Sequence, residues 1–437
     1  MSWWATLLSV FGLLLLLFAT GLPIFACFML INVVAVLTLM GVAGLGLFVN
    51  SMLETTTTEA LVAIPLYVLL GELLFRAGGV SVLYQSLNQL IGAIRGRLYV
   101  IAITLAGILG AISGSAMASV AMLGRFVYPT MIERGCDRRL SIGMILAGAT
   151  LDPIIPPSIL AVILATLANL SVAEFLVAGI LPGIVLAGSF AGYAVIRTII
   201  NPALDSPVGR DPDAKSDWRS TLWSAVQMLP LVVIIFLVLG LILAGVAQPT
   251  EAAAVGIVGS VLMSVLYRKF SLTMLYEACM GAAYTTSTIL IIIASSKLFS
   301  QLLAFTGATA GLIDFTSQLA VNRWLLFFIM MAAVFFFCKF MDQLALMLIA
   351  VPVYSPLIVH LGFDPIWFWM LFLINITLGG ITPPFGYTMF VFKSVRAEVS
   401  MVEIYWSAAP IVGVALLAMV LMSIFPQIVT WLPASLR

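Results

Sequence analysis

Six ionisable residues of this 437-residue sequence stand inside long apolar stretches, where a charged side chain is costly. At the centre of a membrane helix such a residue costs about 2.5–3.5 kcal/mol on insertion scales, so it is a functional candidate by default. The six are Glu72, Arg125, Asp152, Lys297, Lys339 and Asp342. Carboxylates in this setting suit a cation, and basic side chains suit the carboxylate of an organic acid.

Asp152 belongs to the stretch LDPIIPPS, in which prolines interrupt an otherwise apolar helix. Proline removes a backbone donor and clashes with the preceding turn, so the chain must unwind here. The double proline at 156–157 recurs at 383–384, an offset of 227 residues, within the stretch LGGITPPF. Unwound backbone inside a bilayer is tolerated only where it is buried in protein or lines a wet cavity. The pattern therefore predicts two matching broken helices, at 139–169 and 365–394.

A helical hairpin is predicted before each broken helix. Two pairs of apolar segments, each about 15 residues long, are interrupted by SGSA in one half and by KFMDQ in the other. A segment of this length covers only some 22 Å at about 1.5 Å per residue. Because a bilayer core is roughly 30 Å thick, each pair is predicted to enter and leave on one side as a re-entrant hairpin. The hairpins cover 98–131 and 323–358.

The composition indicates that these hairpins and broken helices belong to an all-α polytopic membrane protein. Hydrophobic residues make up 63% of the chain and charged residues 8%, and the mean hydropathy is +1.21, outside the range of soluble domains. The apolar runs are continuous rather than alternating, which excludes a transmembrane β-barrel. His360 is the single histidine, and the four cysteines form no CxxC pair. Zinc-protease, haem and disulfide chemistry are therefore not expected, and neither is an enzyme.

Hydropathy divides the chain into four regions. They are N-terminal scaffold helices at 1–59, a first repeat at 60–200, a polar linker at 201–221 and a second repeat at 222–437. Two further segments, 81–97 and 271–283, mix polar and apolar residues at near-helical spacing. These two are interpreted as interfacial arm helices that brace the scaffold, with partner-binding surfaces as the alternative.

Paired broken helices at matching positions of two halves are typical of the midplane site of a secondary transporter. Half-helix C-termini and freed carbonyls suit a cation, whereas half-helix N-termini suit an anionic substrate. The two inverted repeats therefore favour sodium-coupled uptake of an acid. A channel or a membrane scaffold without coupled transport stays open as an alternative.

Seven stretches of the sequence, in their order, resemble the large membrane subunit of TRAP transporters, the tripartite ATP-independent periplasmic carriers of the ion-transporter superfamily. They are AIPLYVLLGELLFRAGG (63–79), SGSAMASVAMLGRFVYPTM (113–131), GATLDPIIPPSIL (148–160), AGILPG (178–183), PTEAAAVG (249–256), FMDQLALMLIAVPVYSPL (340–357) and LGGITPPFGYTMFV (378–391). Each motif alone is modest, but together they span nearly the whole chain.

The resemblance implies a multi-pass protein of the bacterial inner membrane that imports a small carboxylate, such as a dicarboxylate or a sialic acid, on a sodium gradient by an elevator mechanism. It implies a periplasmic substrate-binding protein and a small four-helix membrane subunit as partners, within membrane lipid. Because the sequence starts directly on the large subunit, the small subunit is expected to be a separate polypeptide. A sodium or proton symporter of the same superfamily that needs no binding protein is the alternative.

By position, the resemblance places cation ligands at each hairpin tip and at the break beside it, with the substrate between the tips. The cation-binding residues it implies are Ser113, Gly114, Ser115, Gly148, Thr150, Asp342, Thr377, Gly379, Gly380 and Thr382, to which we add Asp152 from its place in the first break. The predicted substrate-binding residues are Ser115, Pro157, Ser158, Pro384 and Gly386, to which we add Lys339. Sodium is the expected ion, with no other cofactor, since hydroxyls, a carboxylate and unwound carbonyls supply oxygen ligands.

Of the six ionisable residues, Glu72 and Asp342 match the usual pattern of the family, whereas Arg125, Asp152, Lys297 and Lys339 depart from it, as does Cys338. Relatives usually carry glycine in place of Asp152 and Cys338, a small or apolar residue in place of Lys339, and no charge at Lys297. Asp152 is expected either to strengthen a cation site or to pair with one of the lysines. Lys339 and Asp342 are three residues apart and could form an ion pair if the helix continues through them. The ammonium group would then take the place of a sodium ion.

Three basic residues, Lys297, Lys339 and Arg125, are also hypotheses for ligands of the substrate carboxylate. The alternative is that long basic side chains extend to the membrane interface. The interface is favoured for Arg125, near the end of its hairpin helix, and a functional role is favoured for Lys339, beside Asp342.

Overall fold

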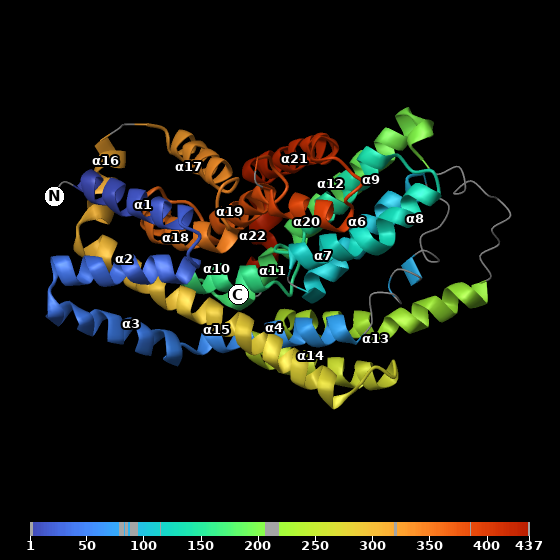
Figure 1. Ribbon diagram of the computed structural model, residues 1–437, viewed down its shortest axis with the longest axis horizontal. Helices are drawn as coiled ribbons and strands as arrows, with labels where there is room; N and C mark the ends of the chain where they lie inside the picture. The colour runs from blue at the N-terminus through green and yellow to red at the C-terminus, as the bar shows by residue number, and fades with distance from the viewer. Residues whose placement is uncertain are drawn as a thin grey trace.

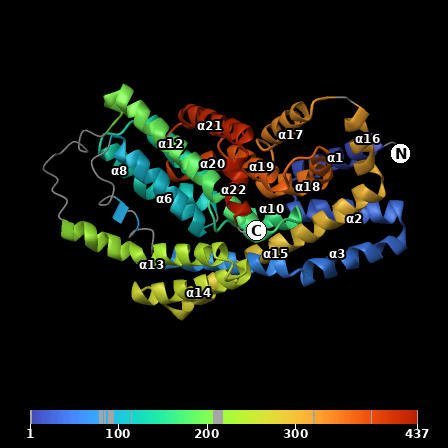
Figure 2. The same ribbon diagram turned by 180° about the vertical axis from the view of Figure 1, so that it is seen from behind.

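The structure is a computed structural model that describes part of the chain. The described residues are 3–77, 83, 86, 87, 95–113, 115–205, 218–318, 321–384 and 386–435. Within them the regular structure is helical throughout. Figures 1 and 2 show a layer of long helices along one side of the molecule, with the hairpins and broken helices packed above it. The prediction of an all-α fold is confirmed.

The scaffold consists of helices that range in length from 11 to 34 residues. They are α1 (Trp3–Ala19), α2 (Ile24–Leu39), α3 (Leu45–Thr57), α4 (Ala63–Arg76), α13 (Trp218–Leu243), α14 (Pro249–Leu266), α15 (Leu272–Phe305) and α16 (Ala308–Gln318). α4 packs against α14 and α15, while α15 also packs against α2 and α3. Short 3-10 turns join some of them, at Val42–Gly44, Glu59–Val62 and, before the linker, Pro202–Leu204.

The first repeat contains a hairpin followed by a broken helix. The first arm of the hairpin is α6 (Arg97–Ser113). The second arm is α7 (Ala116–Met122), which continues through a π-helical turn (Leu123–Val127) into α8 (Tyr128–Glu133). The broken helix consists of α9 (Arg138–Ala149) and α10 (Ile159–Leu167), separated by the double proline.

The second repeat contains the same two parts. Its hairpin is α17 (Arg323–Phe337) followed by α18 (Gln343–His360), and its broken helix is α19 (Pro365–Gly379) followed by α20 (Tyr387–Val395). The first half of each broken helix lies in the protein core, since every residue of α9 from Leu140 to Ala149 and of α19 from Ile366 to Gly379 is buried. A helix that is apolar all round is expected in such a position.

The remaining helices surround the broken helices. They are α11 (Val172–Ala178), α12 (Ile180–Ile200), α21 (Met401–Ile424) and α22 (Gln427–Ala434). α9 packs between α6 and α21, and α19 packs against α17 and α21. Each hairpin is thus held on a broken helix of its own repeat.

Six stretches of the described chain are long and apolar enough to cross a membrane. They include α18, whose 18 residues exceed the predicted length. The shortness that predicted a re-entrant path therefore holds for α6 and α17 but not for α18. What defines the second hairpin is the turn between α17 and α18.

The segment 271–283, which was interpreted as an interfacial arm helix, is continuous with the apolar helix that follows it. It forms the beginning of α15, which runs for 34 residues without a break, because no proline or turn residue interrupts the apolar pattern that follows. Most of the other predicted arm helix, 81–97, and the linker residues 206–217 lie outside the described residues.

Candidate ion and substrate site

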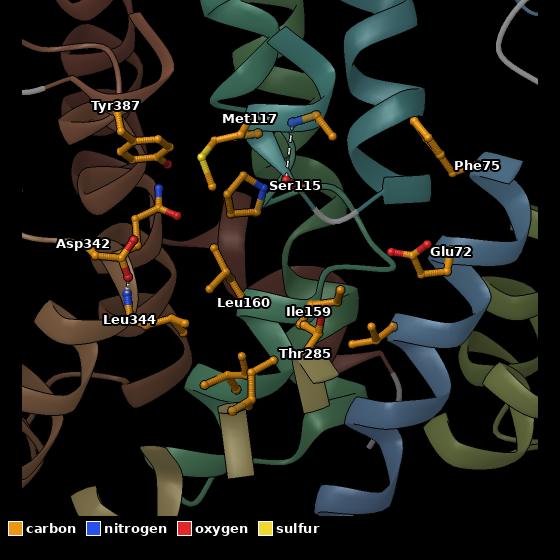
Figure 3. A pocket seen from close by; sticks show the side chains of 18 of the residues that line it. Glu72, Phe75, Ser115, Met117, Ile159, Leu160, Thr285, Asp342, Leu344 and Tyr387 are labelled. Carbon is orange, nitrogen blue, oxygen red and sulfur yellow. Dashed lines mark hydrogen bonds between the residues drawn. The ribbon is translucent and has the colours of Figure 1, made fainter. Parts of the chain in front are cut away.

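A cavity of about 530 Å³ lies between the two hairpin tips and the scaffold (Figure 3). The first tip contributes Ser115–Ala118 and the second tip contributes Asp342–Leu344. Three residues of α10 between Ile159 and Ile163 form another wall, and helices α4 and α15 close the scaffold side. Tyr387, the first residue of α20, also lines it. The cavity therefore contacts both hairpins, both broken helices and the scaffold.

Each hairpin tip presents the N-terminus of a helix to this cavity. Ser115 is the N-cap of α7, and its Oγ accepts a hydrogen bond from the Ala118 N–H at 3.4 Å. Asp342 is the N-cap of α18, and its Oδ1 accepts one from the Leu344 N–H at 2.9 Å. A cap satisfies only part of the free donors in the first turn of a helix. The tips therefore offer backbone N–H groups, which attract an anion.

Each break leads into a further helix N-terminus beside the cavity. Ser158 caps α10, since its Oγ donates to the Pro153 carbonyl at 2.6 Å and accepts a backbone hydrogen bond from the first turn at 3.2 Å. Gly386 precedes α20, and the Thr388 hydroxyl donates to the Gly380 carbonyl across the loop. The Pro–Pro peptide bond is cis in both breaks. Four helices, α7, α10, α18 and α20, thus begin at or beside one cavity.

Three of the predicted cation ligands are buried threonines. Thr150, Thr377 and Thr382 each donate from Oγ1 to a carbonyl three or four residues earlier, at 2.8, 2.7 and 2.5 Å respectively. A hydroxyl has one hydrogen and two lone pairs, so each oxygen can still bind a cation. Thr150 follows the last turn of α9 and Thr377 lies in the last turn of α19, where the negative end of the helix dipole also favours a cation.

Two of the predicted glycines are the points at which hairpin and broken helix touch. A Cβ on Gly148 of α9 would lie 2.0 Å from the Cβ of Ala106 in α6. A Cβ on Gly379 of α19 would lie 2.2 Å from the carbonyl oxygen of Cys338, at the end of α17. Both distances are far below a van der Waals contact. The absence of a side chain therefore allows each hairpin to approach its break.

Asp152 is fully buried in the first break, and neither of its carboxylate oxygens has a hydrogen-bond partner among the described residues. The carboxylate fills the space over Gly110 of α6, where a Cβ would lie 1.9 Å from Oδ1. The Ser119 hydroxyl of α7 lies beside it, also buried and also without a well-formed hydrogen bond in the described part of the chain. This carboxylate therefore has no described group that balances its charge.

The expected ion pair between Lys339 and Asp342 is wrong, because the helix does not continue through them. α17 ends at Phe337, and Asp342 caps the next helix instead of pairing along the same one. The Lys339 ammonium lies over the ring of Phe335, 4.5 Å from its centroid, in a cation–π contact. The predicted role of Lys339 in substrate binding stays a prediction, although it is not among the residues that line the cavity.

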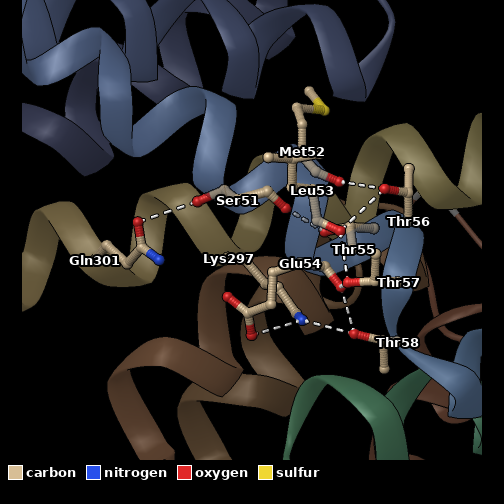
Figure 4. A network of polar contacts seen from close by, with 10 residues as sticks. All are labelled: Ser51, Met52, Leu53, Glu54, Thr55, Thr56, Thr57, Thr58, Lys297 and Gln301. Atoms are coloured by element: carbon tan, nitrogen blue, oxygen red, sulfur yellow. Dashed lines mark hydrogen bonds and ion pairs between the residues drawn. The ribbon is translucent and has the colours of Figure 1, made fainter.

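Lys297 lies in a separate polar network that joins α3 to α15 (Figure 4). Its Nζ forms an ion pair with Glu54 at 3.0 Å and donates to the Thr58 hydroxyl at 3.5 Å. In the same network, Ser51 donates to the Gln301 side chain at 3.0 Å. The charge of Lys297 is thus balanced within the scaffold. The alternative in which Asp152 pairs with Lys297 or Lys339 is therefore wrong as well, and its role in a cation site stays a prediction.

The structure separates the predicted site residues into two groups. Ser115 and Asp342 line the cavity. A second group is buried around the breaks: Gly148, Thr150, Asp152, Pro157, Ser158, Thr377, Gly379, Gly380, Thr382 and Gly386. Pro384 is exposed, and its carbonyl accepts a hydrogen bond from the Tyr405 hydroxyl at 3.2 Å. Gly114 and the side chain of Ser113 lie outside the described residues.

Arg76, which lines the cavity, was not predicted from the sequence. Arg76 of α4 forms ion pairs with Glu72 at 3.0 Å and with Glu277 of α15 at 2.5 Å. The spacing of four residues between Glu72 and Arg76 is a visible signal for the first pair, whereas the second depends on how α4 and α15 pack. Figure 3 shows Glu72 and Asp342 on opposite sides of the cavity, with Tyr387 on the side of Asp342.

Comparison with known proteins finds relatives that are all named as subunits of one kind of transporter. The family model of the tripartite ATP-independent periplasmic transporter, DctM component, matches residues 11–428. The chain is 31% identical to the 2,3-diketo-L-gulonate TRAP transporter large permease protein of Escherichia coli, over 86% of this chain and 87% of the relative. It is 29% identical to the C4-dicarboxylate TRAP transporter large permease protein of Pseudomonas aeruginosa, over 87% and 86%. It is 26% identical to the ectoine TRAP transporter large permease protein of Halomonas elongata, over 97% of both.

Among solved structures, the Alcanivorax borkumensis YdaH transporter, described as having an unusual topology, matches with a TM-score of 0.64. The identity is 15%, and the match covers 89% of this chain and 90% of the other, so it shows a shared fold alone. The family match, by contrast, spans nearly the whole chain. The chain therefore belongs to the DctM family, the large permease component of TRAP transporters, and is a multi-pass inner-membrane transporter subunit rather than an enzyme.

Proposed function

We propose that this chain imports a small organic acid on a sodium gradient, by an elevator movement of the hairpins and broken helices along the scaffold. The observation that carries the proposal is the meeting of four helix N-termini at one cavity between the two hairpin tips. Free N–H groups and the positive ends of helix dipoles favour a carboxylate in such a place. The scaffold helices α4 and α15 form the opposite wall, along which the movement would take place.

Sodium as the coupling ion is supported by the chemistry of the two breaks. The hydroxyls of Thr150, Thr377 and Thr382 keep lone pairs for a cation, and the C-termini of α9 and α19 end beside them. Asp152 adds a buried carboxylate with no described partner. Because an unpaired charge inside a protein is costly, a bound cation at the first break would balance it.

The substrate is proposed as a class rather than as one compound. The relatives are named for ectoine, C4-dicarboxylates and 2,3-diketo-L-gulonate, and their identities to this chain lie between 26% and 31%. Sequence similarity therefore favours none of these three substrates. In this cavity the N-termini would bind the carboxylate, while Met117, Ile159 and Leu160 offer apolar surface to the rest of the molecule. A dicarboxylate, a sialic acid or a similar carboxylate fits this description.

Two protein partners complete the proposed system. A periplasmic binding protein would deliver the acid to the cavity, and a small four-helix membrane subunit would support the scaffold within the lipid. Membership in a tripartite family supports both.

The test is uptake of a radiolabelled acid into proteoliposomes that contain this chain, the small subunit and the binding protein. Gradients of sodium, of protons and of voltage are imposed one at a time. Saturable accumulation driven by the sodium gradient supports the proposal. Accumulation driven by protons alone overturns sodium coupling, uptake without the binding protein favours a two-component symporter, and linear unsaturable flux indicates a channel.

A further inference from the structure

The second arm of the first hairpin contains two carbonyls that each lack one of the backbone donors that a helix can supply. The arm passes through a π-helical turn from Leu123 to Val127, and Pro129 follows two residues later. A proline has no N–H, so it cannot donate to the carbonyl four or five residues before it. For Pro129 those carbonyls belong to Arg125 and Gly124. The other helical donor for Gly124, the Tyr128 N–H, is bonded to the Leu123 carbonyl, so the Gly124 carbonyl requires a donor from elsewhere.

Arg396, which follows α20 in the second repeat, supplies that donor. Its Nε donates to the Gly124 carbonyl at 2.6 Å and its Nη2 donates to the Arg125 carbonyl at 2.8 Å. The side chain of Arg396 is only 22% exposed. The side chain of Arg125 is exposed. This residue takes part in the contact through its backbone oxygen. A guanidinium group joins the two carbonyls with fixed geometry, whereas a lysine ammonium is a single point charge.

The surroundings of Arg396 hold α20 against the same turn. A Cβ on Gly124 would lie 2.8 Å from Cγ2 of Val395, so the close contact requires a glycine. The rings of Tyr128 and Phe392 meet edge to face with centroids 5.3 Å apart. α20 therefore packs against the first hairpin at the π-helical turn, and the hydrogen bonds of Arg396 lie at the end of this contact.

We propose that Arg396 is a positioning residue that couples the first hairpin to the second broken helix. α7 and α20 both begin at the cavity, at Ser115 and Tyr387, and they pack against each other. Arg396 joins their far ends. The spacing between the first hairpin tip and the second break, on which the ion and substrate sites depend, is therefore fixed by a contact about 14 Å away along the helix.

The second hairpin makes a different hydrogen bond at a proline of its second arm, so the proposal applies to the first hairpin alone. Pro352 in α18 cannot donate to the Leu348 carbonyl, four residues earlier. That carbonyl accepts a hydrogen bond from the Ser296 hydroxyl of scaffold helix α15 at 3.3 Å. One hairpin is thus bonded to the opposite repeat by a charged side chain, and the other is bonded to the scaffold by a neutral one.

The first test is amide hydrogen exchange of the full chain in detergent, with choline chloride and no sodium. For Arg396→Gln we expect roughly tenfold faster exchange in residues 115–133 and 387–395, the factor expected for losing a charge-assisted hydrogen bond. Helices α13 and α14 should exchange as in the wild type. Arg396→Lys should give an intermediate effect, and Arg125→Ala should match the wild type because its carbonyl remains.

Gly124→Ala offers an independent variant, since its new Cβ would push Val395 away without touching Arg396 itself. It should give the same regional pattern as Arg396→Gln. Exchange in Arg396→Gln that stays within about twofold of the wild type in both segments overturns the proposal. So does faster exchange that extends over α13 and α14, because that shows general destabilisation.

The second test rests on the proposed function and uses sodium chloride as the probe. In the wild type, sodium should slow exchange at both breaks over one concentration range. In Arg396→Gln, the sodium concentrations that slow exchange at the two breaks should differ by roughly tenfold. If both breaks of this variant still respond over one range of sodium concentration, the proposed coupling is overturned. If sodium slows nothing in the wild type, the sodium part of the proposed function fails, while the first test still decides the role of Arg396.

Discussion

Each break packs closely against the hairpin of its own repeat, but at one matching pair of positions the glycine that allows this contact is on opposite partners in the two repeats. At Asp152, the position of the first break that corresponds to Gly379 by the offset of 227 residues, the glycine is on the hairpin, where Gly110 leaves space for the carboxylate. In the second repeat, the glycine is on the break, where Gly379 leaves space for the end of α17 at Cys338. Only one large group fits at each contact. The exchange therefore places an acidic side chain inside the first contact and only a thiol and a backbone carbonyl inside the second.

The two acidic residues of the site differ for the same reason. Asp152 is fully buried and has no partner in the described part of the chain. Asp342 is exposed at the cavity and caps α18. A carboxylate at a helix N-terminus is stabilised by backbone N–H groups and by the dipole, whereas one in a dry interior needs a bound cation or a proton to balance its charge. On the proposed function, charge balance by a bound cation therefore matters more at the first break than at the second.

The largest effect is expected from Gly379→Ala. The new Cβ would meet the backbone carbonyl of Cys338, which cannot turn aside, and a displacement of about 1 Å near a reacting or binding centre can reduce a rate about 100-fold. Uptake in proteoliposomes should fall by about that factor, and adding Cys338→Ala should not restore it. Gly413→Ala in α21, where a Cβ has open space, is the matched control. Uptake near the wild-type level in Gly379→Ala would show that this contact does not matter.

A smaller and partly reversible effect is expected from Gly110→Ala. Its Cβ would collide mainly with the side chain of Asp152, and overpacking of this kind costs about 1–3 kcal/mol. The thermal midpoint of the purified protein should fall. Adding Asp152→Gly should recover part of the loss, because it removes two of the three nearest atoms. No recovery in the double variant would contradict the assignment of this contact.

Asp152→Asn should weaken sodium binding without unfolding the chain, since the amide has nearly the same shape and no charge. The sodium concentration for half-maximal uptake should rise by about tenfold, equivalent to about 1.4 kcal/mol. The same measurement on Thr166→Val, a buried threonine in α10 away from the break, serves as control. An unchanged sodium dependence would remove Asp152 from the ion site.

The smallest effect is expected from Lys339→Gln. Because the ammonium lies over Phe335 rather than beside Asp342, the half-maximal sodium concentration should stay within about twofold of the wild type, as for loss of a weak cation–π contact. The number of sodium ions per substrate, from the voltage dependence of uptake, should not change. A gain of one sodium ion in this variant would revive the hypothesis that the lysine replaces an ion.

Much of the fold could be predicted because its signals are local. The double prolines at 156–157 and 383–384 break helices through their own chemistry, and the predicted broken helices, 139–169 and 365–394, agree with α9–α10 and α19–α20 to within two residues. The ion pair of Lys339 failed because spacing along a sequence implies contact only within a continuous helix, and the chain turns between the two residues.

The sequence by itself determined that the chain is a helical membrane protein, that it contains two matching devices and that threonines, glycines and carboxylates belong to their breaks. Hydropathy, proline geometry and residue spacing are properties of short segments, so they can be seen without the fold. Only the tertiary structure decided which partners meet: Lys297 with Glu54, Arg396 with the first hairpin, and Asp152 with Gly110. Those contacts join residues far apart in the chain, and they depend on how helices pack, which no local pattern specifies.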